Sequence, residues 1–371
     1  MRITAAELFD VRMPLVTPFE TSFGTQTERA VLLLRIELDG QPGWGECVTL
    51  PDPVYSPEYN DGAAVMIRQH LLPVLIGVDG LTAPKVAELL HRFKGHRMAK
   101  AALEMAVLDA WLRAAGMSFA DYLGAVRDRV PSGVSVGIQP SLDALIDAVA
   151  GFLDAGYVRI KLKIKPGWDI EPVRAVRERF GDIPLQVDAN TAYSLADARH
   201  LAKLDEFNLL LIEQPLEDED LTQHADLARQ LRTPVCLDES ITSPKTAADA
   251  IRLGATSVVN IKAGRVGGYL SARRVHDVCV ASGVPVWCGG MIETGLGRAA
   301  NIALAALPGF SLPGDTSASD RFYCRDIVTE PFVIRDGYID VPTGPGLGVE
   351  VDMDALAGVM SRREKLSIDR S

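Results

Sequence analysis

The feature that most constrains the fold is a series of eight short apolar segments, each of which ends abruptly. They recur at intervals of 24–28 residues, and stretches with a helical apolar period separate them. A strand, a helix and two short loops need about this length. Strict alternation predicts parallel strands with right-handed crossovers, and eight such units close into a barrel. The segments end at Ser135, Lys163, Asp188, Glu213, Asp238, Lys262, Cys288 and Asp315.

The segments outside this series predict a second domain. No convincing helix follows Asp315, so we expect an α/β fold of the (β/α)7β type, a modified TIM barrel. Residues 1–50 alternate β-rich runs with turns, and residues 97–115 have the period of a helix, which predicts an N-terminal α+β capping domain. The expected boundaries are 1–126 for the capping domain, 127–325 for the catalytic barrel, and 326–371 for a C-terminal segment that returns to the capping domain.

Charge and composition exclude several classes of protein. The 371 residues carry a net charge of −11, and no basic stripe interleaved with aromatic residues offsets it, so a nucleic-acid partner is not expected. No apolar stretch reaches the roughly 18 residues of a membrane span, and charged residues interrupt the N-terminus where a signal peptide is apolar. The five scattered cysteines form neither a disulfide framework nor a zinc motif. We therefore expect a cytoplasmic protein without a membrane partner.

The residues that close the strands are the candidates for chemistry, because barrel enzymes place their active sites at the carboxyl ends of strands. Three consecutive units end in Asp188, Glu213 and Asp238. Either aspartate alone would serve as a helix N-cap, but Glu213 precedes Gln214 and Pro215, where no cap is needed. Three acids on neighbouring strand ends require a cation at neutral pH. Since all three offer hard oxygen donors, the sequence predicts a Mg²⁺ or Mn²⁺ site.

Lysines flank the acids along the ring. Lys163 and Lys262 end strands four apart in a ring of eight, so their amines are expected to face each other across the mouth. On an exposed sheet, the alternation of cationic and aliphatic residues around Lys161 would mark a solvated face. Helices cover the outside of a barrel, so here the cationic set must point inward. Lys161 would then favour a neutral amine at Lys163, which could act as a general base. Arg265 would do the same for Lys262, unless it is an ordinary loop residue.

A divalent cation between two opposed amines suits removal of a poorly acidic proton next to a carboxylate. Two bases on opposite faces of one carbon permit racemisation, and a leaving group on the next carbon permits dehydration. The residues alone leave both open. From another class, Lys163 could form a Schiff base in a metal-free aldolase, although three clustered acids have no role there. A binding protein without catalysis would leave the charged mouth unexplained.

Short motifs over nearly the whole length carry a resemblance to a known family. They are Lys161-Leu-Lys163, Asp188-Ala-Asn190, Glu213-Gln-Pro, Asp238-Glu239-Ser240, Asn260-Ile-Lys262, Gly43-Trp-Gly-Glu46-Cys and Cys288-Gly-Gly-Met-Ile-Glu-Thr-Gly-Leu-Gly297-Arg-Ala. The chain resembles the enolase superfamily, in its muconate-lactonising subgroup, and is most similar to o-succinylbenzoate synthases that also racemise N-acylamino acids.

The resemblance implies a Mg²⁺-dependent enzyme that acts on a small carboxylate. The reaction would be dehydration to o-succinylbenzoate in menaquinone biosynthesis or racemisation of N-acylamino and N-succinylamino acids; a dipeptide epimerase or a muconate cycloisomerase is the alternative. A homo-oligomer such as an octamer is also implied. By resemblance, the Mg²⁺ ligands are Asp188, Glu213 and Asp238, the acid–base pair is Lys163 and Lys262, and the supporting residues are Lys161, Asn190, Glu239 and Arg265.

In this family, loops of the capping domain close the barrel mouth. The resemblance therefore implies substrate contacts from two capping loops, with Gly24 as a candidate hinge, unless these side chains are ordinary core. The barrel would contribute contacts from the ends of its first and seventh units. The candidates are Phe19, Phe23, Leu50 and Tyr55 from the cap, and Ser135, Gly290, Met291 and Ile292 from the barrel.

Overall fold

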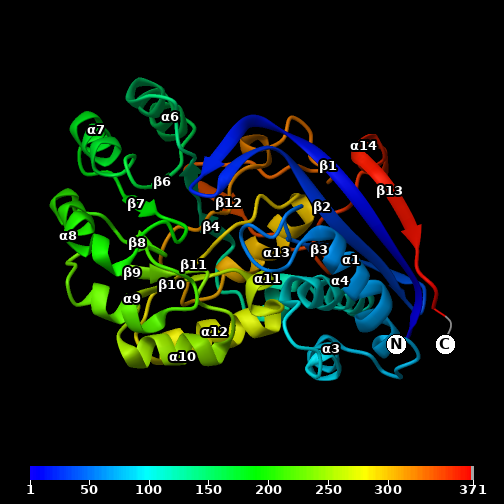
Figure 1. Ribbon diagram of the computed structural model, residues 1–371. Coiled ribbons are helices and arrows are strands. Elements are labelled where there is room, and N and C mark those ends of the chain that lie inside the picture. The colour runs from blue at the N-terminus through cyan, green and yellow to red at the C-terminus, as the bar shows by residue number, and fades with distance from the viewer. Residues whose placement is uncertain (369–371) are drawn as a thin grey trace.

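The N-terminal part of the chain forms an antiparallel sheet to which a C-terminal strand returns. The computed structural model describes residues 1–368 (Figure 1). The order in this sheet is β13-β1-β2-β3. The strands are β1 (Ile3–Thr21), β2 (Gly24–Leu38), β3 (Gln41–Cys47) and β13 (Met360–Lys365). Glu7 of β1 lies opposite Lys365 of β13, so segments from both ends of the chain share one sheet.

Helices cover one face of this sheet, and two glycines set how closely they approach. A Cβ atom on Gly43 would lie 2.2 Å from the Ala106 carbonyl oxygen, and one on Gly45 would lie 2.0 Å from that of Ala102. Only glycine allows this contact between β3 and the long buried helix α4. The helices are α1 (Asn60–Met66), the π-helical turn η1 (Ile67–Leu71), α2 (Leu72–Leu75), α3 (Ala83–Leu90), α4 (Arg97–Ala115) and α5 (Phe119–Leu123).

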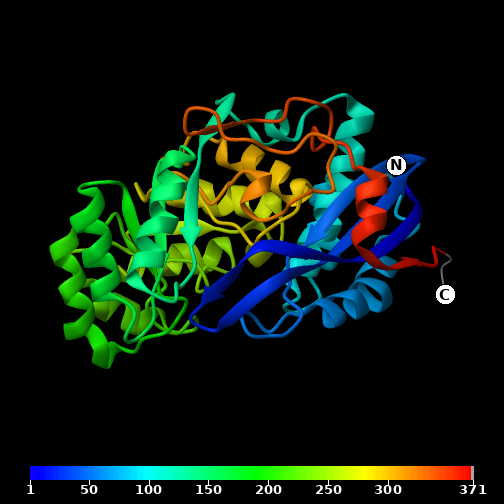
Figure 2. The ribbon, with the colours of Figure 1, turned by 90° about the horizontal axis from the view of Figure 1, so that it is seen from above.

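Seven parallel strands form the second sheet, in the order β11-β10-β9-β8-β7-β6-β5. Every residue of these strands is buried, as expected for a parallel sheet covered by helices. Figures 1 and 2 show the sheet curling inside its helices, with the N-terminal sheet to one side. The strands are β5 (Gly133–Val136), β6 (Arg159–Lys163), β7 (Leu185–Asp188), β8 (Ile212–Glu213), β9 (Val235–Leu237), β10 (Val258–Ile261) and β11 (Val286–Cys288).

The predicted α/β fold with a modified barrel is confirmed, and the eighth run is shorter than a regular strand. It makes isolated parallel bridges, from Phe310 to Val286 and from Gly314 to Ser132. Asp315 N donates to the Cys288 carbonyl at 2.8 Å, so this segment connects β11 to the start of β5 and closes the ring. As expected, only the short 3₁₀ turn η4 (Ser319–Arg321) follows it where a barrel helix would lie.

Helices between the strands cover the outer face of the barrel. Several begin at a side-chain cap, as at Ser141 before α6 and Ser243 before α10. The elements are α6 (Leu142–Asp154), α7 (Ile170–Phe180), η2 (Leu195–Asp197), α8 (Ala198–Leu201), η3 (Ala202–Phe207), α9 (Leu221–Ala228), α10 (Pro244–Leu253), α11 (Ala263–Val266), α12 (Tyr269–Ala281) and α13 (Gly295–Ala305).

The C-terminal segment contains the β structure expected after residue 326. It includes β12 (Tyr338–Asp340), which pairs with β4 (Arg129–Pro131), then α14 (Met353–Val359) and finally β13. Within residues 1–368, no helix has the length and apolarity needed to cross a membrane.

The tip of the β1–β2 hairpin rests on loops at the carboxyl ends of the barrel strands. The Glu20 carbonyl accepts a hydrogen bond from Ile138 N at 2.9 Å, and Ser22 Oγ donates to the Asn190 carbonyl at 3.1 Å. Lys165 forms an ion pair with Glu20 at 2.9 Å. The hairpin thus brings capping-domain side chains to the mouth of the barrel.

Candidate active site

A small cavity of about 50 Å³ lies at the carboxyl ends of the parallel strands. Both predicted catalytic lysines line it, although they come from opposite sides of the ring. Four predicted substrate contacts line it as well, and three lining residues had no predicted role: Asp315, Ser317 and Phe322. The predicted residues in the wall are Lys161, Lys163, Lys262, Phe19, Ser135, Gly290 and Ile292.

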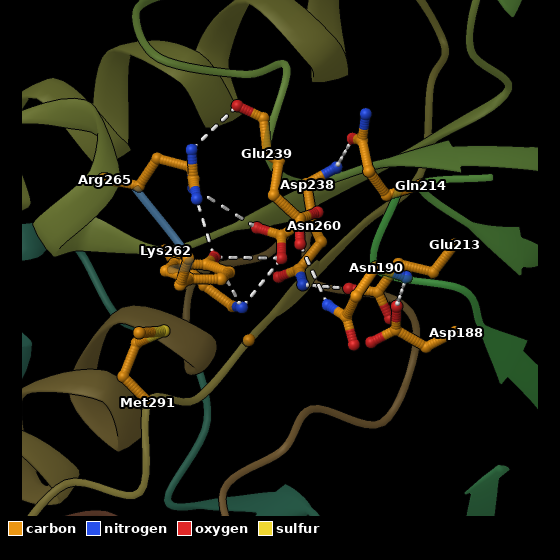
Figure 3. A network of polar contacts seen from close by, with 12 residues as sticks. Asp188, Asn190, Glu213, Gln214, Asp238, Glu239, Asn260, Lys262, Arg265 and Met291 are labelled. Atoms are coloured by element: carbon orange, nitrogen blue, oxygen red, sulfur yellow. Dashed lines mark hydrogen bonds and ion pairs between the residues drawn. The ribbon is translucent and has the colours of Figure 1, made fainter. Parts of the chain in front are cut away.

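Three buried acids stand beside this cavity, on neighbouring strand ends. Asp188 lies in register with Lys163 on one side and with Glu213 on the other, and Asp238 directly follows β9. Amide groups orient them: Asn190 N donates to Asp188 Oδ1 at 3.0 Å, and Asn260 Nδ2 donates to Glu213 Oε1 at 2.6 Å. Figure 3 shows these side chains together.

Gln214 orients the third acid through the backbone. Its Oε1 accepts from Asp238 N at 3.0 Å and from Ser240 N at 3.2 Å. Its φ is +36°, a left-handed conformation that costs energy outside glycine and is often found at functional sites. Sequence reasoning placed Gln214 in a motif but gave it no role. Its hydrogen bonds to Asp238 and Ser240 could not be read from the order of residues alone.

Lysine side chains are the counter-charges of the acids in this structure. Lys163 Nζ lies 2.6 Å from Asp188 Oδ2 and also donates to Asn190 Oδ1 at 2.6 Å. Lys262 Nζ lies 2.7 Å from Asp238 Oδ2. With lysines bonded to the acids in this way, no three or more His, Cys, Asp or Glu side chains of residues 1–368 are gathered around one point as metal ligands are.

The predicted inward direction of the lysines is correct, but Lys161 does not act as an unpaired like charge. Its Nζ lies 2.7 Å from Asp315, 2.9 Å from Glu213 and 3.3 Å from Asp188. Burial disfavours its charge, yet these carboxylates outweigh burial and raise its pKa. Asp315 approaches from the eighth run, a contact that the expectation did not include because it considered only the neighbouring lysine on the strand.

The pKa values of two of these acids are shifted in opposite directions. Burial opposes ionisation of Asp188, but Lys163 and Lys161 outweigh it and lower its pKa. Burial raises the pKa of Glu213 to about 8, and the negative charges of Asp188 and Asp238 reinforce the shift. Asp238 Oδ1 is buried and accepts no hydrogen bond within the described chain. A set of three hard carboxylate donors with an unused oxygen and mutual repulsion fits a divalent cation.

Tyr55, from the loop between β3 and α1, reaches the opposite lysine. Its hydroxyl accepts from Lys262 Nζ at 2.9 Å and from Arg265 Nε at 3.2 Å, and it donates to Asp238 Oδ2 at 3.2 Å. Burial disfavours the charge of Lys262, but Asp238, Tyr55 and Glu239 raise its pKa well above the ordinary value. The expected effect of Arg265 is therefore wrong in this arrangement, because Lys262 bonds directly to an acid.

The other supporting residues join the same network. Asn190 Nδ2 donates to Glu239 Oε1 at 2.9 Å, and Arg265 Nη1 donates to the Glu239 carbonyl at 2.8 Å. Glu239 is fully buried, which together with the charges of Asp238 and Asp188 raises its pKa to about 7. These bonds connect the Lys163 side of the cavity to the Lys262 side.

The remaining predicted contacts divide into two groups. Phe19 lines the cavity, and Phe23 packs on Tyr55 with ring centroids 6.1 Å apart. Leu50 and Met291 are buried but are not part of the cavity wall. The Leu50 carbonyl accepts from Asn60 N, and the Met291 side chain packs in the core of the capping domain.

Arg29, which was not anticipated, connects the segments that carry Leu50 and Met291. It is fully buried, and its guanidinium donates to the carbonyls of Met291, Thr49, Val48 and Ala30. It therefore ties the loop that leads to Tyr55 to the loop after β11. A lone arginine in a strand carries no sequence signal for such a role.

Comparison with known proteins shows which family this chain belongs to. Residues 3–124 match the N-terminal domain of mandelate racemase and muconate lactonizing enzyme, and residues 144–355 match the enolase C-terminal domain-like family. The chain belongs to the enolase superfamily. It is an enzyme of that superfamily, whose members generally use a divalent metal ion.

The relatives of this chain are named for two different enzyme activities. An N-succinylamino acid racemase from an Amycolatopsis species is 68% identical over 350 residues, covering 94% of this chain and 95% of the relative. An o-succinylbenzoate synthase from Geobacillus kaustophilus is 47% identical, covering 92% of each chain. The crystal structure of an enolase-superfamily member from Listeria innocua covers 100% of both chains with a TM-score of 0.95 and 39% identity.

Proposed function

We propose that this enzyme removes the proton α to a carboxylate with Mg²⁺ bound, and that it racemises N-succinylamino and other N-acylamino acids and forms o-succinylbenzoate by dehydration. The observation that carries the proposal is the position of the two lysines. Lys163 and Lys262 end strands on opposite sides of the ring, line one cavity, and each contact one of the three acids.

Asp188, Glu213 and Asp238 would hold the ion. When bound, it would neutralise the three acids and stabilise negative charge that develops on the substrate carboxylate. Another divalent ion such as Mn²⁺ could substitute, because the donors are all carboxylate oxygens. The amide groups of Asn190 and Asn260 would keep two of these carboxylates oriented.

The two lysines would share the proton transfers. In racemisation, the neutral amine of one lysine accepts the α-proton from its face of the carbon, and the ammonium of the other delivers a proton to the opposite face. In dehydration, one lysine serves first as the base and then as the acid for the departing hydroxyl, while the second stabilises the enolate charge. Tyr55 and Phe19 would exclude water from the closed cavity.

Isotope exchange tests the proposal. Each enantiomer of N-succinylphenylalanine is incubated in D₂O with Mg²⁺, and α-proton loss and inversion are followed by NMR and chiral chromatography. Wild type should exchange and invert both enantiomers. Lys163→Ala and Lys262→Ala should each lose inversion by at least about 100-fold, and each should retain exchange with only one enantiomer.

The controls separate the two-base arrangement from general damage. Lys245→Ala alters an exposed lysine on α10 and should behave as wild type. Inversion at the wild-type rate by either active-site variant would contradict the proposal. Undiminished exchange after chelation would contradict the metal requirement.

Parallel assays decide between the related activities. The racemase name belongs to the relative with 68% identity and the synthase name to one with 47%, so both substrates should be turned over. A muconate cycloisomerase from Rhodococcus opacus is only 30% identical, which makes cycloisomerisation the weaker candidate. Borohydride trapping tests the Schiff-base alternative and should leave Lys163 unmodified.

We also propose that the enzyme is cytoplasmic and assembles as a homo-oligomer such as an octamer, which light scattering would test. Its five cysteines are all free, and four are buried, which suits a reducing compartment. The proposed division after residue 126 is supported by the gap between the two family matches, at residues 124 and 144.

A further inference from the structure

One guanidinium behind the cavity wall has no carboxylate partner among residues 1–368. Arg321 ends the 3₁₀ turn η4, which follows the eighth run. Its Nη2 donates to the Ser135 carbonyl at 2.9 Å, the one hydrogen bond that its side chain makes within the described chain. Its Nε is buried and has no acceptor. An unsatisfied buried donor is unfavourable, so this group is placed to receive an acceptor that the chain itself does not supply.

Arg321 lies between the cavity wall and helix α6, where the Phe152 ring centre is 4.7 Å from its guanidinium carbon. Its guanidinium carbon lies 4.6 Å from the ring centre of Phe322 and 5.9 Å from that of Phe19. Both rings line the cavity, as does Ser135, so the guanidinium packs against residues that share this cavity with the two catalytic lysines. Burial lowers the pKa of Arg321 to about 10, which leaves it charged at neutral pH.

The order of the strands puts Arg321 across the ring from the acids. It contacts the end of β5 and follows the eighth run, and these are the ring positions opposite Asp238 and Glu213. A substrate whose α-carboxylate lies at the acids would extend its acyl group toward β5. In an N-succinylamino acid, six bonds separate the two carboxylate carbons, roughly 7 Å when extended. The second carboxylate would therefore approach this wall.

We propose that Arg321 determines acyl specificity by binding the distal carboxylate of N-succinyl substrates. The inference rests on the proposed function and names the residue that recognises the second charge. A cavity of about 50 Å³ holds only a few waters, so the wall must move when substrate enters. Phe19 is carried by the β1–β2 hairpin, and its displacement would expose the guanidinium to the acyl chain.

The test compares two substrates that differ only at the distal group. N-succinyl and N-butanoyl derivatives of the same amino acid are racemised by wild type and by Arg321→Gln. The variant should lose about 10- to 100-fold in kcat/KM with the succinyl substrate, the range expected for a charged hydrogen bond, and less than about threefold with the butanoyl substrate. Arg321→Lys should recover part of the succinyl preference.

The matched control is Arg325→Gln, which alters an exposed arginine paired with Asp352 and should change neither substrate. An equal loss with both substrates would show that Arg321 only supports the fold and would overturn the proposal, as would unchanged succinyl activity.

Wild type without any racemase activity would instead refute the proposed function. The role of Arg321 is then decided by calorimetry with N-succinylglycine and N-butanoylglycine. Weaker binding of only the succinyl ligand to Arg321→Gln would support the proposal, and equal binding to both proteins would overturn it.

Discussion

Replacing Lys161 by methionine is expected to destabilise the metal-free protein more than any surface change of the same kind. Lys161 is 2% exposed, and its ammonium lies within 3.3 Å of three carboxylates, those of Asp315, Glu213 and Asp188. Methionine fills a similar volume but leaves these buried charges without their shared partner. Breaking a buried ion pair by removing one partner costs about 3–5 kcal/mol. At roughly 2–4 °C per kcal/mol for a large domain, the melting temperature should fall by about 10 °C.

The assay is thermal unfolding followed by circular dichroism, first in EDTA and then in millimolar Mg²⁺. The deficit of Lys161→Met should shrink in Mg²⁺, because a cation at Asp188 and Glu213 would replace part of the lost charge. Lys165→Met is the matched control. Its ion pair with Glu20 is more than a third exposed on both sides, so its loss should cost less than about 1 kcal/mol. Equal melting of Lys161→Met and wild type in EDTA would refute the reasoning.

Two further predictions concern stability. The pKa of Glu46 is raised from 4.5 to about 7 by burial and by the charge of Glu293. Folding therefore takes up a proton at this site, so its contribution to stability is present below about pH 4.5 and is lost as the pH rises through 7. Glu46→Gln should remove this loss, which amounts to at most about 1.4 kcal/mol of unfolding free energy per pH unit. Urea titrations from pH 5 to 8 measure it. Gly45→Ala should destabilise by about 1–3 kcal/mol or more, because its Cβ would meet the backbone of α4.

Both stability predictions have a control variant and an outcome that would contradict them. Glu37→Gln changes a partly exposed acid on the neighbouring strand and should keep the wild-type pH profile. A Glu46→Gln profile parallel to that of wild type would contradict the assigned titration. Gly358→Ala introduces a Cβ that meets nothing within 4 Å and should be neutral or slightly stabilising. Equal stabilities of the two alanine variants would contradict the packing argument.

The strand ends were predictable because their signal is local and periodic. A buried parallel strand must be apolar throughout, so a charge directly after it marks the mouth of the barrel. This is how Lys163, Asp188 and Glu213 could be placed on adjacent strands, where the register now puts them side by side. The eighth run was placed correctly but expected to be more regular than its isolated bridges allow.

Contacts across the ring were not predictable in the same way. Asp315 reaches Lys161 from a segment more than 150 residues away in sequence, a contact that the expectation for this lysine did not include. Tyr55 was assigned to a lid by resemblance, but its bonds to Lys262 and Arg265 depend on how the two sheets pack. Leu50 and Met291 were named by the same resemblance and lie outside the cavity wall.

The amino-acid order by itself determined which residues stand at the barrel mouth, because the buried apolar strands recur at regular intervals and charged residues follow them directly. Only the tertiary structure decided which charges meet. Coulomb and hydrogen-bond energies depend on separations of a few ångströms, and those separations arise from the closure of the ring and from the hairpin placed over it. Arg321 shows the difference most plainly, because its sequence neighbours are ordinary and its position opposite the acids exists only in the folded chain.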